Sequence, residues 1–256
     1  MTTVALIGAG NMSRAIARGW RLGDGGPAEL MICDAGSGRA AALASETGAT
    51  PLSEAREAFQ RADVAVVATK PASLDSVAEA ADGFQGIVVS LLAGTDLPTV
   101  SKAFPEARCV RVMPNVAVEK RQGVLCWCGS DDDHGDHSEI AGLFSVLGLF
   151  VEVPEALFDA ATAIMGCGPA YVALVAEALA DAGVKAGLGE QNAATMVAQT
   201  LAGTASLLED RDTLSVRRAV TSPGGSTAAG LAVLERGAVR AAFAEAVAAS
   251  IARMQE

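Results

Sequence analysis

The sequence predicts an α/β protein with two domains: a doubly wound parallel β-sheet over residues 1–155 and an all-helical domain over residues 156–256. In the first part, short β-rich runs alternate with helical stretches, which is typical of a parallel sheet covered by helices. In the second part, alanine-rich segments have helical periodicity and no strand alternation. The composition agrees, because 51% of residues are hydrophobic but only 4% are aromatic, so aliphatic side chains must build the core.

The expected strands are short apolar runs bounded by turn residues. They lie at residues 4–7, 30–33, 63–68, 86–90, 109–113, 124–128 and 149–153. A helix should follow the first strand and end near Arg21, and a second helix should span residues 39–47. Long alanine-rich helices in a domain of about 100 residues leave apolar faces uncovered. We therefore expect a homodimer or higher homo-oligomer, formed through the helical domain.

Charge and cysteine usage exclude several classes of protein. The formal charge of −11 makes nucleic acid and anionic membranes poor partners. Charged residues or glycines interrupt the richest apolar stretches before they reach the ~20 residues that span a bilayer. The five cysteines are odd in number and contain no C-x-x-C pair. This pattern favours a reducing, cytoplasmic location over a disulfide-linked scaffold.

The only two histidines, His134 and His137, lie in the acidic segment 131–137. Imidazole and carboxylate oxygens could bind a metal there. The alternative is a solvated loop that caps a helix beginning near Ser138. Because the ligand spacing of a zinc site is absent, we predict no metal site. Histidine is also not expected to be the catalytic acid.

A glycine turn, Gly8-Ala9-Gly10-Asn11-Met12-Ser13, joins the first strand to the first helix. The first glycine permits a tight turn, the second lets a pyrophosphate approach the backbone, and the helix N-terminus supplies N–H groups. Ser13 stands where the usual fingerprint has a third glycine, and it is small enough for close packing. At a first strand–helix junction, this turn predicts a Rossmann-type dinucleotide site.

The residues after the second strand give conflicting indications of which dinucleotide binds. Asp34 ends that strand, where a carboxylate usually accepts the ribose hydroxyls and disfavours a 2′-phosphate. Ser37 and Arg39 follow, and they could hold that phosphate through charge-assisted hydrogen bonds. Arg39 could equally be a solvated residue in the first turn of a helix. If Asp34 faces the ribose, replacing it by serine should raise the preference for NADPH.

Three further loops follow strands at the carboxyl edge, where ligands bind in open α/β sheets. They are Lys70-Pro71, Ala93-Gly94 and Met113-Pro114-Asn115. Lys70 is either a cofactor contact or an ordinary exposed lysine, and the spacing does not distinguish the two.

The segment 222–227 is a second candidate binding site. Pro223 stops the preceding helix, two glycines free the backbone, and Ser226 or Thr227 begins the next helix. Backbone N–H groups and two hydroxyls at a helix start would form an anion cradle. The alternative is a plain helix–helix turn that Ser226 or Thr227 caps.

With these segments in hand, the sequence closely resembles the pyrroline-5-carboxylate reductase family, which catalyses the last step of proline biosynthesis. The resemblance spans essentially the whole chain in one order. It is carried by GAGNM (8–12), VATKP (67–71), RVMPN (111–115), GCGPAYV (166–172), EALADAGVK (177–185) and SPGGST (222–227) running into Leu234-Glu235. The last three segments are specific to the family, whereas many dehydrogenases share the first.

The resemblance implies an oxidoreductase that reduces the C=N bond of 1-pyrroline-5-carboxylate, a small cyclic imino acid, to L-proline. It implies NADPH as cofactor, with NADH possible, and an active site between the Rossmann domain of one subunit and the helical domain of another. By position, the cofactor would contact Ile7, Gly8, Ala9, Gly10, Asn11, Met12, Ala68, Thr69, Lys70, Pro71, Leu91, Leu92 and Ala93. The substrate would contact Glu155, Gly224, Gly225, Ser226 and Thr227, with Ser226 and Thr227 as the catalytic residues.

The chain departs from the family pattern at a few positions. Val116 follows Met-Pro-Asn where Thr-Pro is usual, Met165 and Cys167 replace two serines, and Ala55 stands where an asparagine often contacts the adenosine. These changes bear on which cyclic imine is reduced. The alternatives are therefore a reductase of a related cyclic imino acid or a catalytically weak NAD(P)-binding dimer. A β-hydroxyacid dehydrogenase would need a lysine that residues 169–182 lack.

Overall fold

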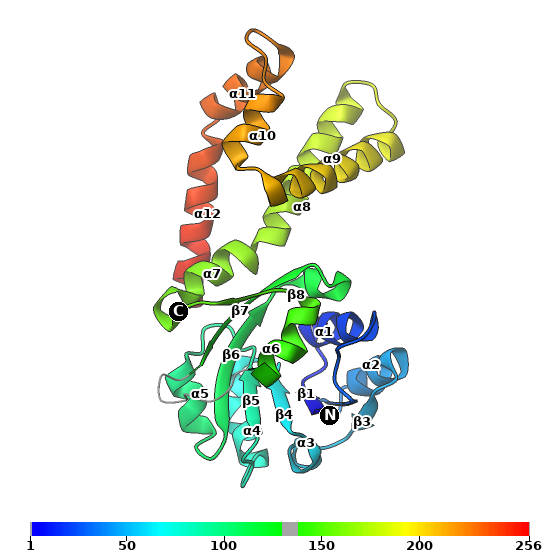
Figure 1. Cartoon of the computed structure of the whole chain (residues 1–256), viewed down its shortest axis with the longest axis vertical. Helices are drawn as coiled ribbons and strands as arrows, with labels where there is room; N and C mark the ends of the chain where they lie inside the picture. The colour runs from blue at the N-terminus through cyan, green and yellow to red at the C-terminus, as the bar shows by residue number, and fades with distance from the viewer. Residues whose placement is uncertain (1, 130–137, 256) are drawn as a thin grey trace. The chain divides into compact units, whose positions relative to one another are not determined.

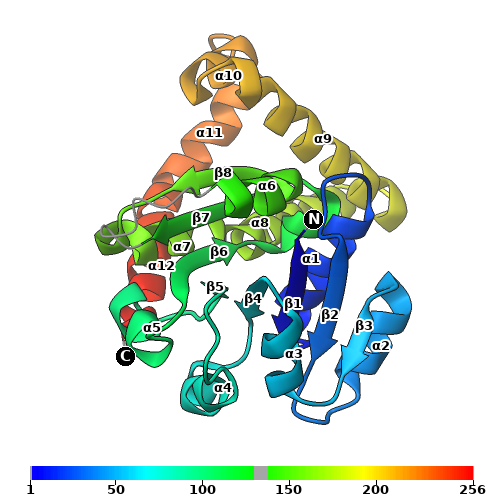
Figure 2. The same ribbon diagram turned by 60° about the horizontal axis from the view of Figure 1, so that its bottom comes forward.

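The computed structural model describes residues 2–129 and 138–255. Within them lies an eight-stranded sheet of order β3-β2-β1-β4-β5-β6-β7-β8 (Figure 2). Strands β1 to β6 pair in parallel, which confirms the doubly wound prediction. The strands are β1 (Thr3–Ile7), β2 (Glu29–Cys33), β3 (Thr50–Leu52), β4 (Val64–Val67), β5 (Ile87–Ser90), β6 (Arg108–Pro114), β7 (Gly123–Gly129) and β8 (Gly148–Glu152).

Two features of the sheet differ from the expectation. Strand β3 was not expected, because it has only three residues and one of them is Pro51, which is tolerated at this edge of the sheet. Strand β7 runs antiparallel to β6. The connection between them contains only the short helix η2 (Val116–Lys120) and a few flanking residues. A parallel crossover needs a dozen residues or more, so this short connection forces the chain to turn back.

Helices cover both faces of the sheet (Figure 1). Along β1, Val4 and Leu6 point to one face and Ala5 and Ile7 to the other, so each face has its own core cluster. Helices α1 (Asn11–Arg21), α2 (Arg39–Thr47) and α6 (Ser138–Phe144) cover the first face. Helices α3 (Ala55–Arg61), α4 (Leu74–Ala80), α5 (Leu97–Ala103) and α7 (Phe158–Met165) cover the second. Short turns of 3₁₀-helix lie at η1 (Pro71–Ser73), η3 (Ser145–Leu147) and η4 (Glu155–Leu157).

Arg121 fixes the C-terminal end of α1. Its backbone is in the left-handed region, with φ of 56°. The Nε group donates to the Gly19 carbonyl at 2.8 Å, and an Nη group donates to the Gly23 carbonyl at 2.8 Å. A cation here adds hydrogen bonds to carbonyls at and after the end of the helix and opposes the negative end of its dipole. Among the charged residues that follow Val116, Arg121 therefore has a structural role.

The chain divides into two compact units, Met1–Cys167 with Ile251–Glu256, and Gly168–Ser250. The second contains α8 (Gly168–Lys185), α9 (Glu190–Asp210), α10 (Thr213–Ala219), α11 (Ser226–Arg236) and most of α12 (Val239–Met254). The described part of this unit contains no strand, which confirms the all-helical prediction. Phe158 and Met165 of α7 pack into the core of the first unit, so the boundary between the two units falls after Cys167. The division after residue 155 is retained as a proposal.

The helical stretch Glu155–Lys185 is long and apolar enough to cross a membrane, judged by length and composition alone. Its mean hydropathy is 1.6, and only 11% of the window is buried within the chain. Core helices of soluble proteins meet the same criterion, so this is weak evidence for a membrane span. The exclusion of membranes stays a prediction, although this stretch is more apolar than the sequence pattern suggested.

Candidate active site

The glycine turn connects three strands of the sheet. The Gly8 N–H donates to the Cys33 carbonyl of β2 at 2.8 Å. Gly8 has a φ of 110°, and a Cβ there would lie 2.6 Å from the Ala68 carbonyl oxygen, which follows β4. Only glycine fits at this position. Ser13 Oγ donates to the Gly8 carbonyl at 2.6 Å, so the residue that replaces the third glycine also ties α1 to the turn.

Glycine at position 10 leaves open space in front of the start of α1. It is the N-cap of α1, with an ordinary φ of −81°, and a Cβ on it would meet nothing within 4 Å. Neither backbone strain nor packing therefore requires glycine. A pyrophosphate held against the N–H groups at the start of α1 would fill that space. The turn fits the dinucleotide predicted for it.

A cavity of about 520 Å³ lies over this turn at the carboxyl edge of the sheet. Its wall includes Ile7, Gly8, Ala9, Gly10, Asp34, Arg39, Ala68, Thr69 and Lys70, all of them predicted cofactor residues. It also includes Ala55, the position where the family often has an adenosine-contacting asparagine, and six residues that no sequence pattern indicated, namely Cys33, Ala35, Ser53, Ser73, Ser76 and Val77. Ser53 was missed together with β3, the strand that it follows. The structure thus brings together most of the residues predicted from three separate loops.

Other predicted cofactor residues lie outside this wall. Leu92 is 1% exposed and packs in one core cluster, while Leu91 packs in the cluster on the opposite face. Pro71 lines a second cavity of about 630 Å³. Asn11, Met12 and Ala93 are not part of the 520 Å³ wall. Their contacts with a cofactor stay predictions, as do the roles of the residues inside the wall.

The carboxylate of Asp34 is bound within its own loop. Its Oδ1 accepts from the Gly36 N–H at 3.1 Å, and its Oδ2 accepts from the Ala40 N–H at 3.1 Å and from the Ser37 hydroxyl. These bonds, led by the one from Ser37, hold the pKa of Asp34 below its ordinary value. Arg39 Nε donates to Ser37 Oγ at 2.8 Å. Asp34, Ser37 and Arg39 form one hydrogen-bonded chain, in which Asp34 and Arg39 line the cavity and Ser37 is not part of its wall.

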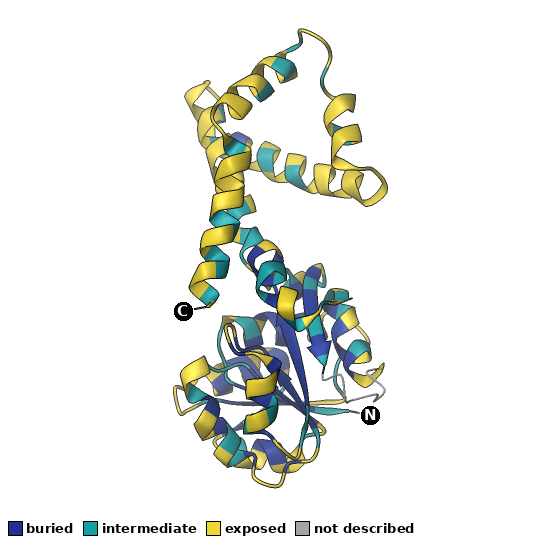
Figure 3. Cartoon of the chain, turned by 90° about the vertical axis from the view of Figure 1, so that its left-hand side faces the viewer, coloured by how far each residue is buried: buried dark blue, intermediate teal, exposed yellow. Residues whose placement is uncertain are grey.

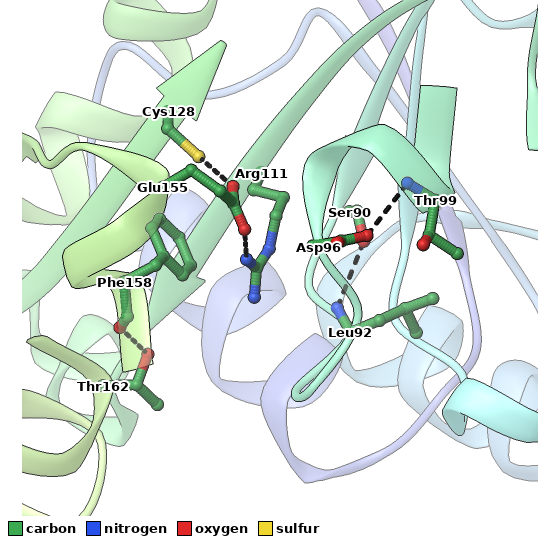
Figure 4. Close-up of polar contacts among 9 residues, drawn as sticks. All are labelled: Ser90, Leu92, Asp96, Thr99, Arg111, Cys128, Glu155, Phe158 and Thr162. Carbon is green, nitrogen blue, oxygen red and sulfur yellow. Dashed lines mark hydrogen bonds and ion pairs between the residues drawn. The ribbon is translucent and has the colours of Figure 1, made fainter. Parts of the chain in front are cut away.

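Glu155 pairs with a buried arginine (Figure 4). Arg111 on β6 is 3% exposed, and its guanidinium donates to Glu155 Oε1 and lies 4.1 Å from the centroid of the Phe158 ring. Cys128 Sγ donates to Glu155 Oε2 at 3.0 Å. Burial, reinforced by this neighbouring carboxylate, raises the pKa of the Cys128 thiol to about 12. Arg111 and Glu155 also line the 630 Å³ cavity.

Met165, one of the departures from the family pattern, contacts Asn115. Its Nδ2 donates to the Met165 carbonyl at 3.1 Å, and its Oδ1 accepts from the Val124 N–H at 3.2 Å. Asn115 thereby ties α7 to β6 and β7. The Met165 side chain is 8% exposed and packs in the core of the first unit, whereas Cys167 is half-buried.

The segment before α11 forms an exposed, hydrogen-bonded turn. Gly224 has a φ of 69°, and the Gly225 N–H donates to the Ser222 carbonyl at 3.0 Å. Gly225 is the N-cap of α11 and has no side-chain cap, so Ser226 and Thr227 lie in the first turn with exposed side chains. Neither hydroxyl is the helix cap that the alternative interpretation required. The histidine segment 131–137 lies outside the described residues.

Comparison with known proteins identifies the class. The family model described as NADP oxidoreductase coenzyme F420-dependent matches residues 3–94, and the model for pyrroline-5-carboxylate reductase dimerisation matches residues 155–256. Pyrroline-5-carboxylate reductases of Synechocystis sp. and Thermus thermophilus are 37% and 36% identical, each over 99% of this chain and 97% of its own.

Solved structures agree with the sequence relatives. The pyrroline-5-carboxylate reductase of Streptococcus pyogenes has a TM-score of 0.90 at 27% identity, covering 99% of this chain and 98% of that one. The Plasmodium falciparum enzyme, solved with NADP bound, has a TM-score of 0.88 at 27% identity, covering 99% and 97%.

The fold and the cavity define an NADP-dependent oxidoreductase with a Rossmann-type domain and a helical dimerisation domain. Within that class, the chain belongs to the pyrroline-5-carboxylate reductase family. The predicted family, enzyme class and cofactor, NADPH, are confirmed. Membership also supports a homo-oligomer, since the helical half matches a dimerisation domain.

Proposed function

We propose that this protein reduces the C=N bond of 1-pyrroline-5-carboxylate to L-proline with NADPH. The observation that carries the proposal is the full-length similarity to reductases of this name at 36–37% identity. The cavity over the glycine turn adds a physical reason. It has the N–H groups, the open space at Gly10 and the flanking Arg39 and Lys70 that a phosphorylated dinucleotide needs.

Bound NADPH supplies the hydride, and the protein's own residues hold the reactants. The N–H groups at the start of α1 would hold the pyrophosphate, and Gly8 keeps the backbone after β1 close to that after β4. The imine nitrogen of the substrate is basic, so the substrate arrives protonated and no strong protein acid is needed. Orientation then carries the catalysis, and well-oriented intramolecular reactions show that it can contribute up to ~7–11 kcal/mol.

For the substrate, we propose the turn at Gly224-Gly225 with the hydroxyls of Ser226 and Thr227. An exposed helix start with two hydroxyls suits a carboxylate, and the dipole of α11 adds about 0.3–1 kcal/mol. Glu155 is a weaker candidate, because its carboxylate already binds Arg111 and Cys128. A homodimer through the helical domain, with larger assemblies built from it, and a cytoplasmic location complete the proposal.

The decisive experiment is NADPH oxidation by the purified protein with pyrroline-5-carboxylate and, separately, with its six-membered homologue. We expect faster turnover with the five-membered ring. A preference for the six-membered ring would assign the protein to a related imino acid. NADPH binding without turnover of either compound would support the catalytically weak dimer instead.

A further inference from the structure

We propose that Asp34 is a positioning residue for NADPH: its carboxylate orders the loop of residues 34–40 and directs Arg39 at the 2′-phosphate. The inference rests on the proposed function only in taking the 520 Å³ cavity as the cofactor site. It reverses the effect that the sequence suggests, because a carboxylate at the end of the second strand normally selects against a 2′-phosphate.

The Asp34 carboxylate is already fully engaged in hydrogen bonds within its own loop. Its two oxygens accept three hydrogen bonds, from the N–H groups of Gly36 and Ala40 and from the Ser37 hydroxyl. A carboxylate that binds a ribose needs both oxygens directed at the two sugar hydroxyls. Here both oxygens face the loop. Asp34 therefore holds the turn between β2 and α2 rather than presenting an open acceptor to the cavity.

The hydrogen-bonded chain runs from Asp34 through Ser37 to Arg39. Ser37 gives its only hydroxyl proton to Asp34, and its oxygen accepts from Arg39 Nε at 2.8 Å. The terminal amino groups of Arg39 have no hydrogen-bond partner among the described residues, and Arg39 lines the cavity. With Nε fixed, the planar guanidinium presents its two amino groups side by side. That geometry matches two oxygens of a phosphate.

Two glycines make the backbone of residues 34–40 flexible, so the loop needs the Asp34 hydrogen bonds to hold one conformation. Gly36 and Gly38 both have positive φ, 80° and 76°, and a Cβ on either would meet nothing within 4 Å. Two unrestrained glycines would let Arg39 move freely without Asp34. The Asp34 charge also repels a phosphate, but between solvated groups this changes affinity only a few-fold. Loss of an oriented hydrogen bond to a charged group costs about ten-fold or more, so the positioning effect dominates.

The test uses calorimetry on the full chain with two probes, 2′,5′-ADP and 5′-AMP, which differ only in the 2′-phosphate. For Asp34→Asn and Ser37→Ala we expect the affinity for 2′,5′-ADP to fall about ten-fold. The affinity for 5′-AMP should stay within about two-fold, since the remaining contacts are untouched. Ser37→Thr keeps the hydroxyl and should bind both probes like the parent. Asp24→Asn removes the same charge at an exposed position outside the cavity and should change neither affinity.

Tighter binding of 2′,5′-ADP by Asp34→Asn, or weaker binding of 5′-AMP, would place Asp34 against the ribose and overturn the proposal. Unchanged affinities in both variants, or no binding of 2′,5′-ADP by the parent chain, would overturn it as well. Ser37→Ala gives an independent answer if Asp34→Asn fails to fold. No imine enters the assay, so failure of the proposed reaction leaves this test intact.

Discussion

The two compact units bury their apolar side chains in different ways (Figure 3). In the first, helices on both sheet faces complete two core clusters within one chain. In the second, α8, α10, α11 and α12 contain no buried residue, and α9 contains only Ala193. Leu174 and Leu179 of α8 are 64% and 52% exposed. Burial of apolar surface is the main favourable term in folding. The first unit obtains it alone, whereas the second leaves its apolar faces exposed, in agreement with its match to a dimerisation domain.

The largest expected effect is the loss of the oligomer when the exposed apolar face of α8 is made charged. Leu174→Asp should dissociate the oligomer, because an ionised carboxylate in an apolar interface costs several kcal/mol. Leu22→Asp is the matched control, since Leu22 in the first unit is 59% exposed and Leu174 is 64% exposed. The molar mass, measured by size exclusion with light scattering, should fall only for Leu174→Asp. If both variants keep the parent mass, the exposed face of α8 is not the interface.

The cofactor site tests whether the first unit acts independently. Gly10→Val should weaken NADPH binding by about 10²–10⁴-fold, because the side chain displaces the pyrophosphate from two or more backbone N–H groups. The protein should still fold, since a Cβ there meets no protein atom within 4 Å, although valine at the N-cap of α1 should cost about 1 kcal/mol of stability. Gly142→Ala on the exposed face of α6 is the control and should bind NADPH normally. Unchanged affinity of the Gly10 variant, measured by calorimetry, would contradict this assignment of the turn.

The Arg111–Glu155 pair tests how the first unit holds the segment that leads into the second. Glu155→Ala leaves the Arg111 charge buried without its partner, which costs about 3–5 kcal/mol for fully buried pairs. Because Glu155 is 33% exposed, we expect about 2–4 kcal/mol in urea unfolding. Glu152→Ala, at an exposed position of β8, should cost far less. If Glu155 instead binds substrate, the KM will rise while the free energy of unfolding stays constant.

The smallest expected effect concerns the second unit's contribution to catalysis. Thr227→Ala should raise the KM for the imino acid about ten-fold, the cost of one hydrogen bond to a carboxylate. The affinity for NADPH should be unchanged. Gly225 already serves as the N-cap, so the melting temperature should hardly move. A substrate analogue without the carboxylate should be indifferent to the change, and equal losses for both compounds would assign Thr227 another role.

Local patterns predicted the fold well. All the expected strands are present, and the glycine turn lies where its spacing placed it. Such patterns work because side-chain alternation and glycine conformation act over a few residues. Strand β3 escaped because three residues around Pro51 carry no periodicity, and the wall residue Ser53 was missed with it. The antiparallel course of β7 follows from the length of a connection rather than from the residues of the strand.

The sequence by itself determined the two halves, the glycine turn and the family, because periodicity and motif spacing are properties of neighbouring residues. Only the tertiary structure decided what the charged groups do. Asp34 and Arg39 appear as competitors along the chain, yet in space they are linked through Ser37. Glu155 and Arg111 are 44 positions apart, and folding brings them into one partly buried ion pair. Which groups a charged side chain binds depends on the distances and angles between atoms in the folded chain. The spacing of residues along the sequence does not contain these distances and angles.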